Sequence, residues 1–577
     1  MNYATSPIQT SGQIALPAWR SRVLYVLLLT GLVALQARAV YLQGINDSFL
    51  QQKGDARYGR VVEVHAHRGM ITDRNGAPLA VSTPVESVWA SPGDVEISSA
   101  QIVQLAKIVG LSVADVRSKL GDTSREFVYL RRQLPPDQAG KVMKLGIPGI
   151  SLQHEYRRYY PSGDVTSHLI GFTDVDDNGQ EGIEYALQAQ LGGKAGSQQV
   201  IKDRRGFIVE DVASLRAPKA GGDVALSIDS KIQSLAFREI KQAVEKHNAK
   251  GGSIVVLDAR TGEVLALANW PSYNSNNRDK PNVSVLRNHA VTDLFEPGST
   301  MKPFTVATAL EEGKVKPGTV INTAGGALTI SGRTIHDTHP ERSLTVAQVI
   351  QKSSNVGTAK IALSMAPSTL WQGLNESGFG SLTGSEFPGE APGKLRDFKT
   401  WRPIEQATMS YGNGIAVNLL QLARAYTVFA NNGELRPITL LKQDTPAVGV
   451  KVYSDATAQM VRDMMEAVVR PGGTAPLAQI TGYRVAGKTG TAHKLENGKY
   501  IDRYVASFVG MAPASNPRLI VAVMINDPGG REYYGGLVAA PVFSSVMGAS
   551  LRMLNVPNDA PLDNVMQAPA EIIGEEV

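Results

Sequence analysis

Ser299 and Lys302 are the residue pair in this chain whose types and spacing best suit catalysis. They follow Pro297-Gly298, a helix-start signal, and precede a helix-forming run at residues 305–310. A spacing of three puts the hydroxyl and the amine on one face of the first helical turn, so the lysine could act as base for a serine nucleophile. Backbone N–H groups of that turn lack intrahelical partners, which favours stabilising an oxyanion. Taken alone, Ser-x-x-Lys is more often an N-cap serine beside a surface lysine.

Two later segments strengthen the catalytic interpretation. Lys352-Ser353-Ser354-Asn355 supplies a Ser-x-Asn group after a helical stretch, and Lys488-Thr489-Gly490-Thr491 follows a short β-like run at 483–486. Ser-x-x-Lys, Ser-Asp-Asn and Lys-Thr-Gly together are the motif set of class A β-lactamases and penicillin-binding proteins. The order is the same here, although the middle motif reads Ser-Ser-Asn, and three motifs in order argue against chance.

The elements that must position these motifs lie between residues 221 and 553. Long helical segments alternate there with β-branched runs such as 252–258 and 519–525. This alternation is typical of a mixed α/β domain. After residue 554 the chain is rich in Pro, Ala and acidic residues, which predicts a disordered tail at 554–577.

The region ahead of this domain has a different pattern. Residues 57–220 contain short β-like runs and turns around helix-like stretches at 101–109 and 136–144. We therefore predict a separate, mostly β domain over 57–220.

An apolar run at residues 23–42 precedes both domains. It just reaches the roughly 20 residues that a spanning helix needs, if Arg38 snorkels to the headgroups. Arg20 and Arg22 before the run predict a cytoplasmic tail at 1–22 and an exported remainder. A cleaved signal peptide is the alternative, since the purely apolar core is short and Ala37-Arg38-Ala39 resembles a cleavage site.

Composition excludes several classes of protein. The 577 residues carry 58 Lys and Arg against 53 Asp and Glu, a net charge of +5, and no long basic block, so no nucleic-acid partner is expected. The absence of cysteine excludes disulfides, a thiolate nucleophile, Cys-ligated zinc and iron–sulfur clusters. His65 with His67, and His336 with His339, lack a third ligand nearby, so no metal or other cofactor is predicted.

Taken together, these segments resemble a class B penicillin-binding protein, most similar to the division-specific transpeptidase of Gram-negative bacteria. The resemblance runs nearly end to end. Beyond the three motifs it rests on Arg68-Gly69-Met-Ile-Thr-Asp73-Arg74-Asn-Gly76, Arg158-Tyr-Tyr-Pro161, Gly179-Gln-Glu-Gly182-Ile-Glu184, Gly384-Ser-Glu-Phe-Pro-Gly-Glu390, Tyr411-Gly-Asn-Gly414, Tyr534-Gly-Gly536 and Ala540-Pro541-Val-Phe543. The first of these is expected to be structural, with Gly69 and Gly76 at positive φ.

The resemblance implies a fold and a location. Residues 221–553 would form the α/β (α+β) transpeptidase domain of the penicillin-binding and serine β-lactamase type. Residues 57–220 would form an elongated pedestal of the dimerisation type. Residues 23–42 would form one transmembrane helix in the cell inner membrane, with the catalytic domain in the periplasm.

The resemblance also implies catalytic roles. Ser299 would attack the D-Ala–D-Ala carbonyl, and Lys302 would act as base in its neutral form. A free lysine has a pKa of about 10.4, so burial or a cation such as Lys488 must lower it. Ser353 would relay a proton to the leaving amine, and Asn355 would bind Lys302 and the substrate amide.

Further residues would hold the substrate. Thr489 and Thr491 would bind its carboxylate, and the strand that includes Gly490 would pair with its backbone. The N–H groups of Ser299 and Thr491 would form the oxyanion hole. Four aromatic residues are candidate cleft walls, with core packing equally expected: Tyr411, Tyr533, Tyr534 and Phe508.

The implied function is cross-linking of peptidoglycan stem peptides in the septum. An acyl-enzyme would form, D-Ala would leave, and an amine of a neighbouring stem would complete the bond; β-lactams would acylate Ser299. The implied partners are a septal glycan polymerase of the membrane and other division proteins. The alternatives are a β-lactamase or D,D-carboxypeptidase, a scaffold with an inactive site, and a paralogue that acts in elongation or in special growth conditions.

Overall fold

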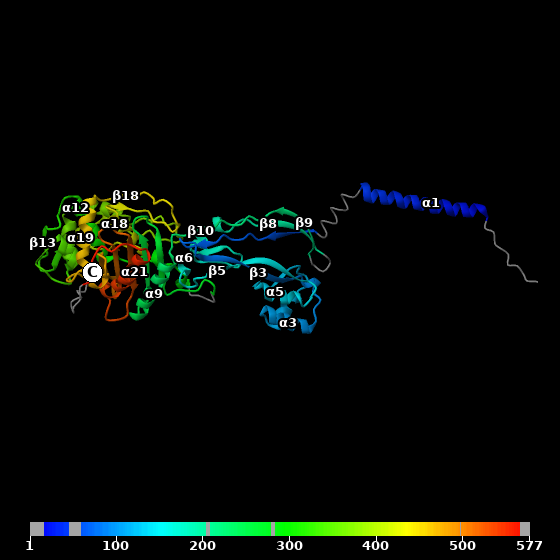
Figure 1. Cartoon of the computed structure of the whole chain (residues 1–577), viewed down its shortest axis with the longest axis horizontal. Helices are drawn as coiled ribbons and strands as arrows, with labels where there is room; N and C mark the ends of the chain where they lie inside the picture. The colour runs from blue at the N-terminus through cyan, green and yellow to red at the C-terminus, as the bar shows by residue number, and fades with distance from the viewer. Residues whose placement is uncertain (1–16, 46–58, 203–207, 278–282, 497, 566–577) are drawn as a thin grey trace, which may run out of the picture. The chain divides into compact units, whose positions relative to one another are not determined.

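The computed structural model describes residues 17–45, 59–202, 208–277, 283–496 and 498–565 (Figure 1). Most of the predicted cytoplasmic tail and the end of the predicted C-terminal tail lie outside the described residues. The chain forms two compact units. The first contains the chain up to residue 65 with 85–155 and 195–218, and the second contains 66–84, 156–194 and everything from 219 onward.

The N-terminal helix α1 (Ala18–Val40) is followed by one π-helical turn, η1 (Tyr41–Ile45). Leucine and valine side chains along α1 are exposed. Residues 18–43 are long and apolar enough to cross a membrane. The predicted run at 23–42 lies inside this segment, which fits a single-pass anchor.

The first unit combines a β-sheet with a small helical core. Strands β1 (Gly59–Val64), β8 (Gly196–Lys202) and β9 (Ile208–Arg216) form an antiparallel sheet in the order β1-β8-β9. Helices α3 (Ser99–Val109), α4 (Val113–Gly121) and α5 (Pro136–Met143) pack beside β4 (Val128–Leu134) around buried aliphatic side chains. Capping boxes at Ser98 and Ser112 start α3 and α4. The two predicted helix-like stretches are α3 and α5.

The second unit is built on a five-stranded antiparallel sheet in the order β12-β11-β21-β20-β19. Its strands are β11 (Gly251–Asp258), β12 (Val264–Trp270), β19 (Ala486–Glu496), β20 (Lys499–Ala512) and β21 (Leu519–Asn526). Every residue of β11 is buried. Helices α9 (Ser230–Lys246) and α21 (Ala540–Met553) contact each other and the sheet, and α17 (Leu419–Ala425) packs on β11 and β21. Strand β19 is an edge strand.

A buried ion cluster lies in the part of the second unit that precedes the sheet. Arg68 Nε donates to Glu184 Oε2 (2.7 Å), and Arg158 Nε donates to Glu184 Oε1 (2.6 Å). All three side chains are at most 1% exposed. Loss of any one of these three residues would leave a buried charge without its partner, which strongly destabilises the fold. The cluster therefore joins three segments that lie far apart in the sequence.

The residues of this cluster belong to the second compact unit. The predicted domain at 57–220 contributes to both compact units, because these units interleave along the chain. Gly76 has the expected positive φ of 86°. Gly69 does not, and is required for a different reason, because a Cβ there would lie 2.1 Å from the Gly222 carbonyl oxygen.

The predicted disordered tail needs correction over residues 554–565, which pack against the second unit. Asn564 donates to the carbonyls of Ile480 (3.2 Å) and Tyr483 (2.9 Å). Asp559 accepts the Arg484 N–H at 2.7 Å. These side chains bond to backbone groups of the turn before β19, which composition alone did not reveal.

Candidate active site

Ser299 and Lys302 lie on a buried turn at the start of a helix. Residues Gly298–Met301 form a 3₁₀ turn, η3, that continues into α12 (Lys302–Glu311). Ser299 lies in this turn and Lys302 begins the helix, so the spacing of three residues keeps both on one face. Both residues are 0% exposed. Among the described residues, no hydrogen-bond partner is found for the Ser299 hydroxyl, so this oxygen is not committed to a structural bond.

The Lys302 amine is held by the second motif. Its Nζ lies 2.9 Å from Ser353 Oγ and 2.5 Å from the Ser353 carbonyl oxygen. Ser353 ends α13 (Val346–Lys352) in the left-handed region, at φ 58°. A non-glycine residue in that conformation is uncommon and occurs often at functional sites. The Lys302–Ser353 contact brings together two of the predicted catalytic residues.

The remaining residues of the second motif are anchored by the segment after β15 (Arg333–His336). Asp337 accepts hydrogen bonds from Ser354 Oγ (2.6 Å) and from the Val356 N–H (2.9 Å) at the start of α14 (Asn355–Leu363). The Asn355 amide donates to the His336 carbonyl at 3.1 Å. This loop was considered for metal binding from its two histidines. The contacts instead give it a part in fixing the Ser353–Asn355 turn.

The third motif lies on the edge strand β19. Lys488 is 0% exposed, and its Nζ lies 3.1 Å from Thr489 Oγ1. The Thr489 hydroxyl also lies 2.7 Å from Thr474 Oγ1. The Thr491 hydroxyl accepts the Gly535 N–H at 3.0 Å. The motif's hydroxyls are thus oriented by groups that lie outside the motif.

Gly490 allows the edge strand to approach the serine turn. A Cβ at this position would lie 2.5 Å from Ser507 Oγ and 2.8 Å from the Pro297 carbonyl oxygen. Strand β19 therefore packs directly on η3, so the third motif adjoins the turn that contains Ser299. No larger residue fits between them.

The aromatic residues divide between core and surface. Tyr411 is 5% exposed and packs in a small hydrophobic cluster with Ile335 and Val356, and Phe508 is 0% exposed against Phe543. Both side chains therefore have the core packing that was one of the two expected alternatives, and their place beside the substrate cleft stays a prediction. Tyr533 and Tyr534 are half-buried, and their rings lie 4.5 Å apart just before α20 (Gly535–Val538), which contacts β19.

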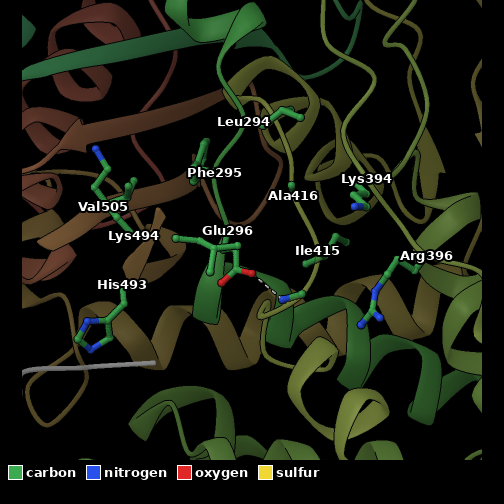
Figure 2. Close-up of a pocket in the computed structure, with 12 residues that line it drawn as sticks. Leu294, Phe295, Glu296, Lys394, Arg396, Ile415, Ala416, His493, Lys494 and Val505 are labelled. Carbon is green, nitrogen blue, oxygen red and sulfur yellow. Dashed lines mark hydrogen bonds between the residues drawn. The ribbon is translucent and has the colours of Figure 1, made fainter. Parts of the chain in front are cut away.

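A pocket of about 480 Å³ is lined by residues 294–296, which come directly before the serine turn in the sequence, and by residues 493–495 of β19 (Figure 2). Glu296 lies in it, and its Oε1 accepts the Gly414 N–H at 2.8 Å. Tyr500 donates to Glu296 Oε2 at 2.9 Å. Burial raises the pKa of Glu296. Sequence reasoning missed Glu296, as it missed Asp337 and Thr474, because only the tertiary fold brings their partners to them.

The fold and the three assembled motifs have the arrangement of a penicillin-binding transpeptidase domain, and the family models agree. The chain matches the family described as "Penicillin binding protein transpeptidase domain" over residues 252–548 and the "Penicillin-binding Protein dimerisation domain" over residues 63–226. It therefore belongs to the class B penicillin-binding proteins. The enzyme is a peptidoglycan D,D-transpeptidase, whose transpeptidase domain acts on peptidoglycan and binds β-lactams.

Named relatives cover nearly the whole chain. The probable peptidoglycan D,D-transpeptidase PenA of Neisseria gonorrhoeae is 44% identical over 561 residues, which are 96% of this chain and 95% of the relative. The peptidoglycan D,D-transpeptidase FtsI of Escherichia coli K12 is 44% identical, over 94% of this chain and 93% of the relative. The apo transpeptidase domain of Burkholderia pseudomallei penicillin-binding protein 3 is 49% identical, with a TM-score of 0.54, and covers 58% of this chain and 98% of that chain.

Proposed function

We propose that this enzyme cross-links stem peptides of the septal wall through an acyl-enzyme on Ser299. The observation that carries this proposal is the contact of Lys302 Nζ with Ser353 Oγ at 2.9 Å, next to a buried serine hydroxyl with no structural partner among the described residues. A nucleophile, a base and a relay group are what acyl transfer requires. The division role rests on the similarity to the FtsI protein of E. coli.

In the first half-reaction Ser299 Oγ attacks the carbonyl carbon of the D-Ala–D-Ala bond, and its proton passes to neutral Lys302. Complete burial of Lys302 penalises the charged form of the amine, which favours the base. The backbone N–H groups of Ser299 and Thr491 stabilise the oxyanion. The proton then passes through Ser353 Oγ to the leaving nitrogen, so the C–N bond breaks and D-Ala departs.

The second half-reaction replaces the serine ester with a new amide. The amine of a neighbouring stem attacks the ester carbonyl, its proton returns through Lys302, and Ser299 Oγ leaves. Lys488, Thr489 and Thr491 hold the carboxylate of the first substrate. The edge strand β19 pairs with the peptide backbone. A β-lactam follows the first half-reaction only, because its leaving group stays attached.

The location of the enzyme follows from α1. Arg20 and Arg22 before the helix direct the N-terminus to the cytoplasm, so α1 anchors the enzyme in the inner membrane and both units lie in the periplasm. The glycan strands are made by a separate membrane polymerase, with which α1 and the first unit associate together with other division proteins.

Labelling of cells with a fluorescent penicillin tests the proposed function. Wild-type protein should be labelled and concentrate at midcell, and Ser299→Ala should remain at midcell without label. Label along the side wall alone would support an elongation-type role instead. A purified enzyme that rapidly hydrolyses a bound penicillin would favour the β-lactamase alternative, and septal cross-linking by Ser299→Ala in cells without a paralogue would favour the scaffold.

A further inference from the structure

The second unit has a polar pocket of about 310 Å³ beside helix α19 (Asp455–Val469). Its other walls are the turn between β11 and β12, the turn between β20 and β21, and the segment that follows α18 (Thr427–Ala430). That segment includes the hairpin of β17 (Glu434–Leu435) and β18 (Val450–Lys451). Among the described residues that line this pocket, none belongs to the three catalytic motifs.

Arg462 of α19 is a buried cation without a counterion. Only 3% of this residue is exposed, and its guanidinium donates to two neutral acceptors, the Phe429 carbonyl at 2.8 Å and Gln459 Oε1. Within the described part of the chain, no carboxylate lies at ion-pair distance from Arg462, and its Nε has no hydrogen-bond partner. Glu466 of the same helix pairs with Arg484 at 2.6 Å instead. Because arginine is almost never fully buried without a charged partner, Arg462 requires an anion that the protein itself does not supply.

Three further cations line the pocket, and their charge is only partly neutralised. Arg436 pairs with Glu434 at 3.1 Å, and Lys451 pairs with Asp455. The Nε of Arg436 has no hydrogen-bond partner among the residues that the structure describes. Arg260 is exposed, and no described residue forms an ion pair or a side-chain hydrogen bond with it. The lining therefore contains four cations and two carboxylates, an excess of two positive charges.

The composition of the lining indicates what kind of anion fits. All lining residues except Ala430 and Pro517 are polar or charged, which suits a small anionic group better than an apolar ligand. The four cations come from four separate segments of the chain, so they surround the contents of the pocket. A phosphate group offers three or four oxygens in a tetrahedral arrangement to such donors, whereas a carboxylate offers two in one plane. Guanidinium groups also match the geometry of phosphate.

We propose that this pocket binds a phosphate group, with Arg462 as the buried counterion at its base and Arg260 at its mouth. The site uses no residue of the acyl-transfer mechanism, so the inference goes beyond the proposed function. Helix α19 also contacts β19, α12 and α13, so the phosphate binds to a helix that supports the elements of the three catalytic motifs. The phosphate group belongs either to a free phosphate or monoester, or to the phosphodiester of a lipid headgroup.

Isothermal titration calorimetry of the full-length enzyme in detergent tests the proposal at constant ionic strength. The two probes are inorganic phosphate and glycerophosphoglycerol, which has the phosphodiester of a lipid headgroup without the acyl chains. Acetate serves as the planar comparison. We expect acetate to bind at least about tenfold more weakly than the better probe, because it accepts fewer charged hydrogen bonds.

Variants of the pocket identify where the probe binds. Arg462→Gln and Arg260→Gln should each weaken binding of the better probe by about tenfold, because a hydrogen bond to a charged group contributes that much. Arg260→Gln changes an exposed side chain, so it tests the site even if the loss of buried Arg462 disturbs folding. The control is Arg552→Gln, which changes an exposed arginine of α21 outside the pocket and should bind like the wild type.

The result also distinguishes the two sources of the phosphate group. Tighter binding of glycerophosphoglycerol would assign the site to a lipid headgroup, and tighter binding of inorganic phosphate would assign it to a free phosphate or monoester. No binding of either probe, equal binding of acetate, or wild-type affinity in both Arg260→Gln and Arg462→Gln would overturn the inference.

Discussion

Lys302 Nζ on α12 lies 2.9 Å from the hydroxyl of Ser353, a residue held at φ 58° at the end of α13. The two residues come from different helices, and the left-handed conformation of Ser353 is what brings both its hydroxyl and its carbonyl to the amine. The contact therefore depends on local backbone geometry as much as on side-chain identity.

Removal of the Ser353 hydroxyl should slow acylation. Ser353→Gly keeps the left-handed backbone without strain, so any loss reports the hydroxyl. Positioned proton-transfer groups contribute about 10²–10⁴-fold, and we expect a loss in that range in the rate of penicillin acylation. The control is Ser364→Ala, which changes an exposed serine after the end of α14 and should be acylated at the wild-type rate. If Ser353→Gly were acylated at the wild-type rate, Ser353 would not be the proton relay.

Asp337→Asn should loosen the second motif. The variant weakens the bonds to Ser354 Oγ and to the Val356 N–H, and loss of a buried charged acceptor costs about 1–3 kcal/mol. We expect lower thermal stability together with slower acylation. Asp229→Asn, at the N-cap of α9, is the matched control and should lower stability alone. Equal acylation rates in the two variants would show that Asp337 stabilises the fold without positioning the motif.

Gly490→Ala should separate β19 from the serine turn. The added methyl would lie 2.5 Å from Ser507 Oγ and 2.8 Å from the Pro297 carbonyl oxygen, so the strand must shift. We expect at least about a tenfold loss of penicillin acylation, because misplacement of a site by about 1 Å is costly. Gly318→Ala, with open space around it, controls for the substitution itself. A fully active Gly490→Ala would contradict the close packing.

The stability of the second unit should decline in mild acid because of His168. Burial lowers the pKa of this ring to about 4, whereas an unfolded histidine titrates near 6.5. Below pH 6.5 the unfolded state binds the extra proton, so the unfolding free energy falls by about 3 kcal/mol between pH 6.5 and 4 and is fully retained above pH 6.5.

Denaturant unfolding of the wild type and of His168→Gln across pH 4 to 7 checks this prediction. The ring faces Tyr273 and the Val285 carbonyl, with His289 nearby. The variant should be less stable at pH 7 and show a flatter pH dependence. His339→Gln, at an exposed position, should keep the wild-type slope. A wild-type slope in His168→Gln would assign the acid sensitivity to other groups.

The three motifs could be predicted from the sequence because each is local. Ser299 and Lys302 need only one helical turn, and Lys488-Thr489-Gly490 needs only one strand. The structure refines this prediction, because Ser299 lies in the 3₁₀ turn η3 and α12 begins only at Lys302. Asp337 could not be found in this way, since its importance comes from residues 354 and 356, which the fold brings to it.

Other features of the structure depend on contacts between residues far apart in the sequence. Aromatic type alone does not distinguish a cleft wall from a core residue, and the structure gives Tyr411 and Phe508 apolar neighbours that the sequence does not identify. The ion cluster of Arg68, Arg158 and Glu184 could not be predicted, because its residues lie far apart in the sequence. Composition suggested disorder at residues 554–565, where Asp559 and Asn564 bind backbone groups.

Intact-protein mass spectrometry of the full-length enzyme with penicillin is the decisive experiment for Ser299 as the nucleophile. We expect one covalent adduct on Ser299, absent from Ser299→Ala, that persists far longer than the acyl-enzyme of a β-lactamase would. An adduct that survives in Ser299→Ala, or one that forms on Ser299 and is rapidly released as hydrolysed penicillin, would contradict it.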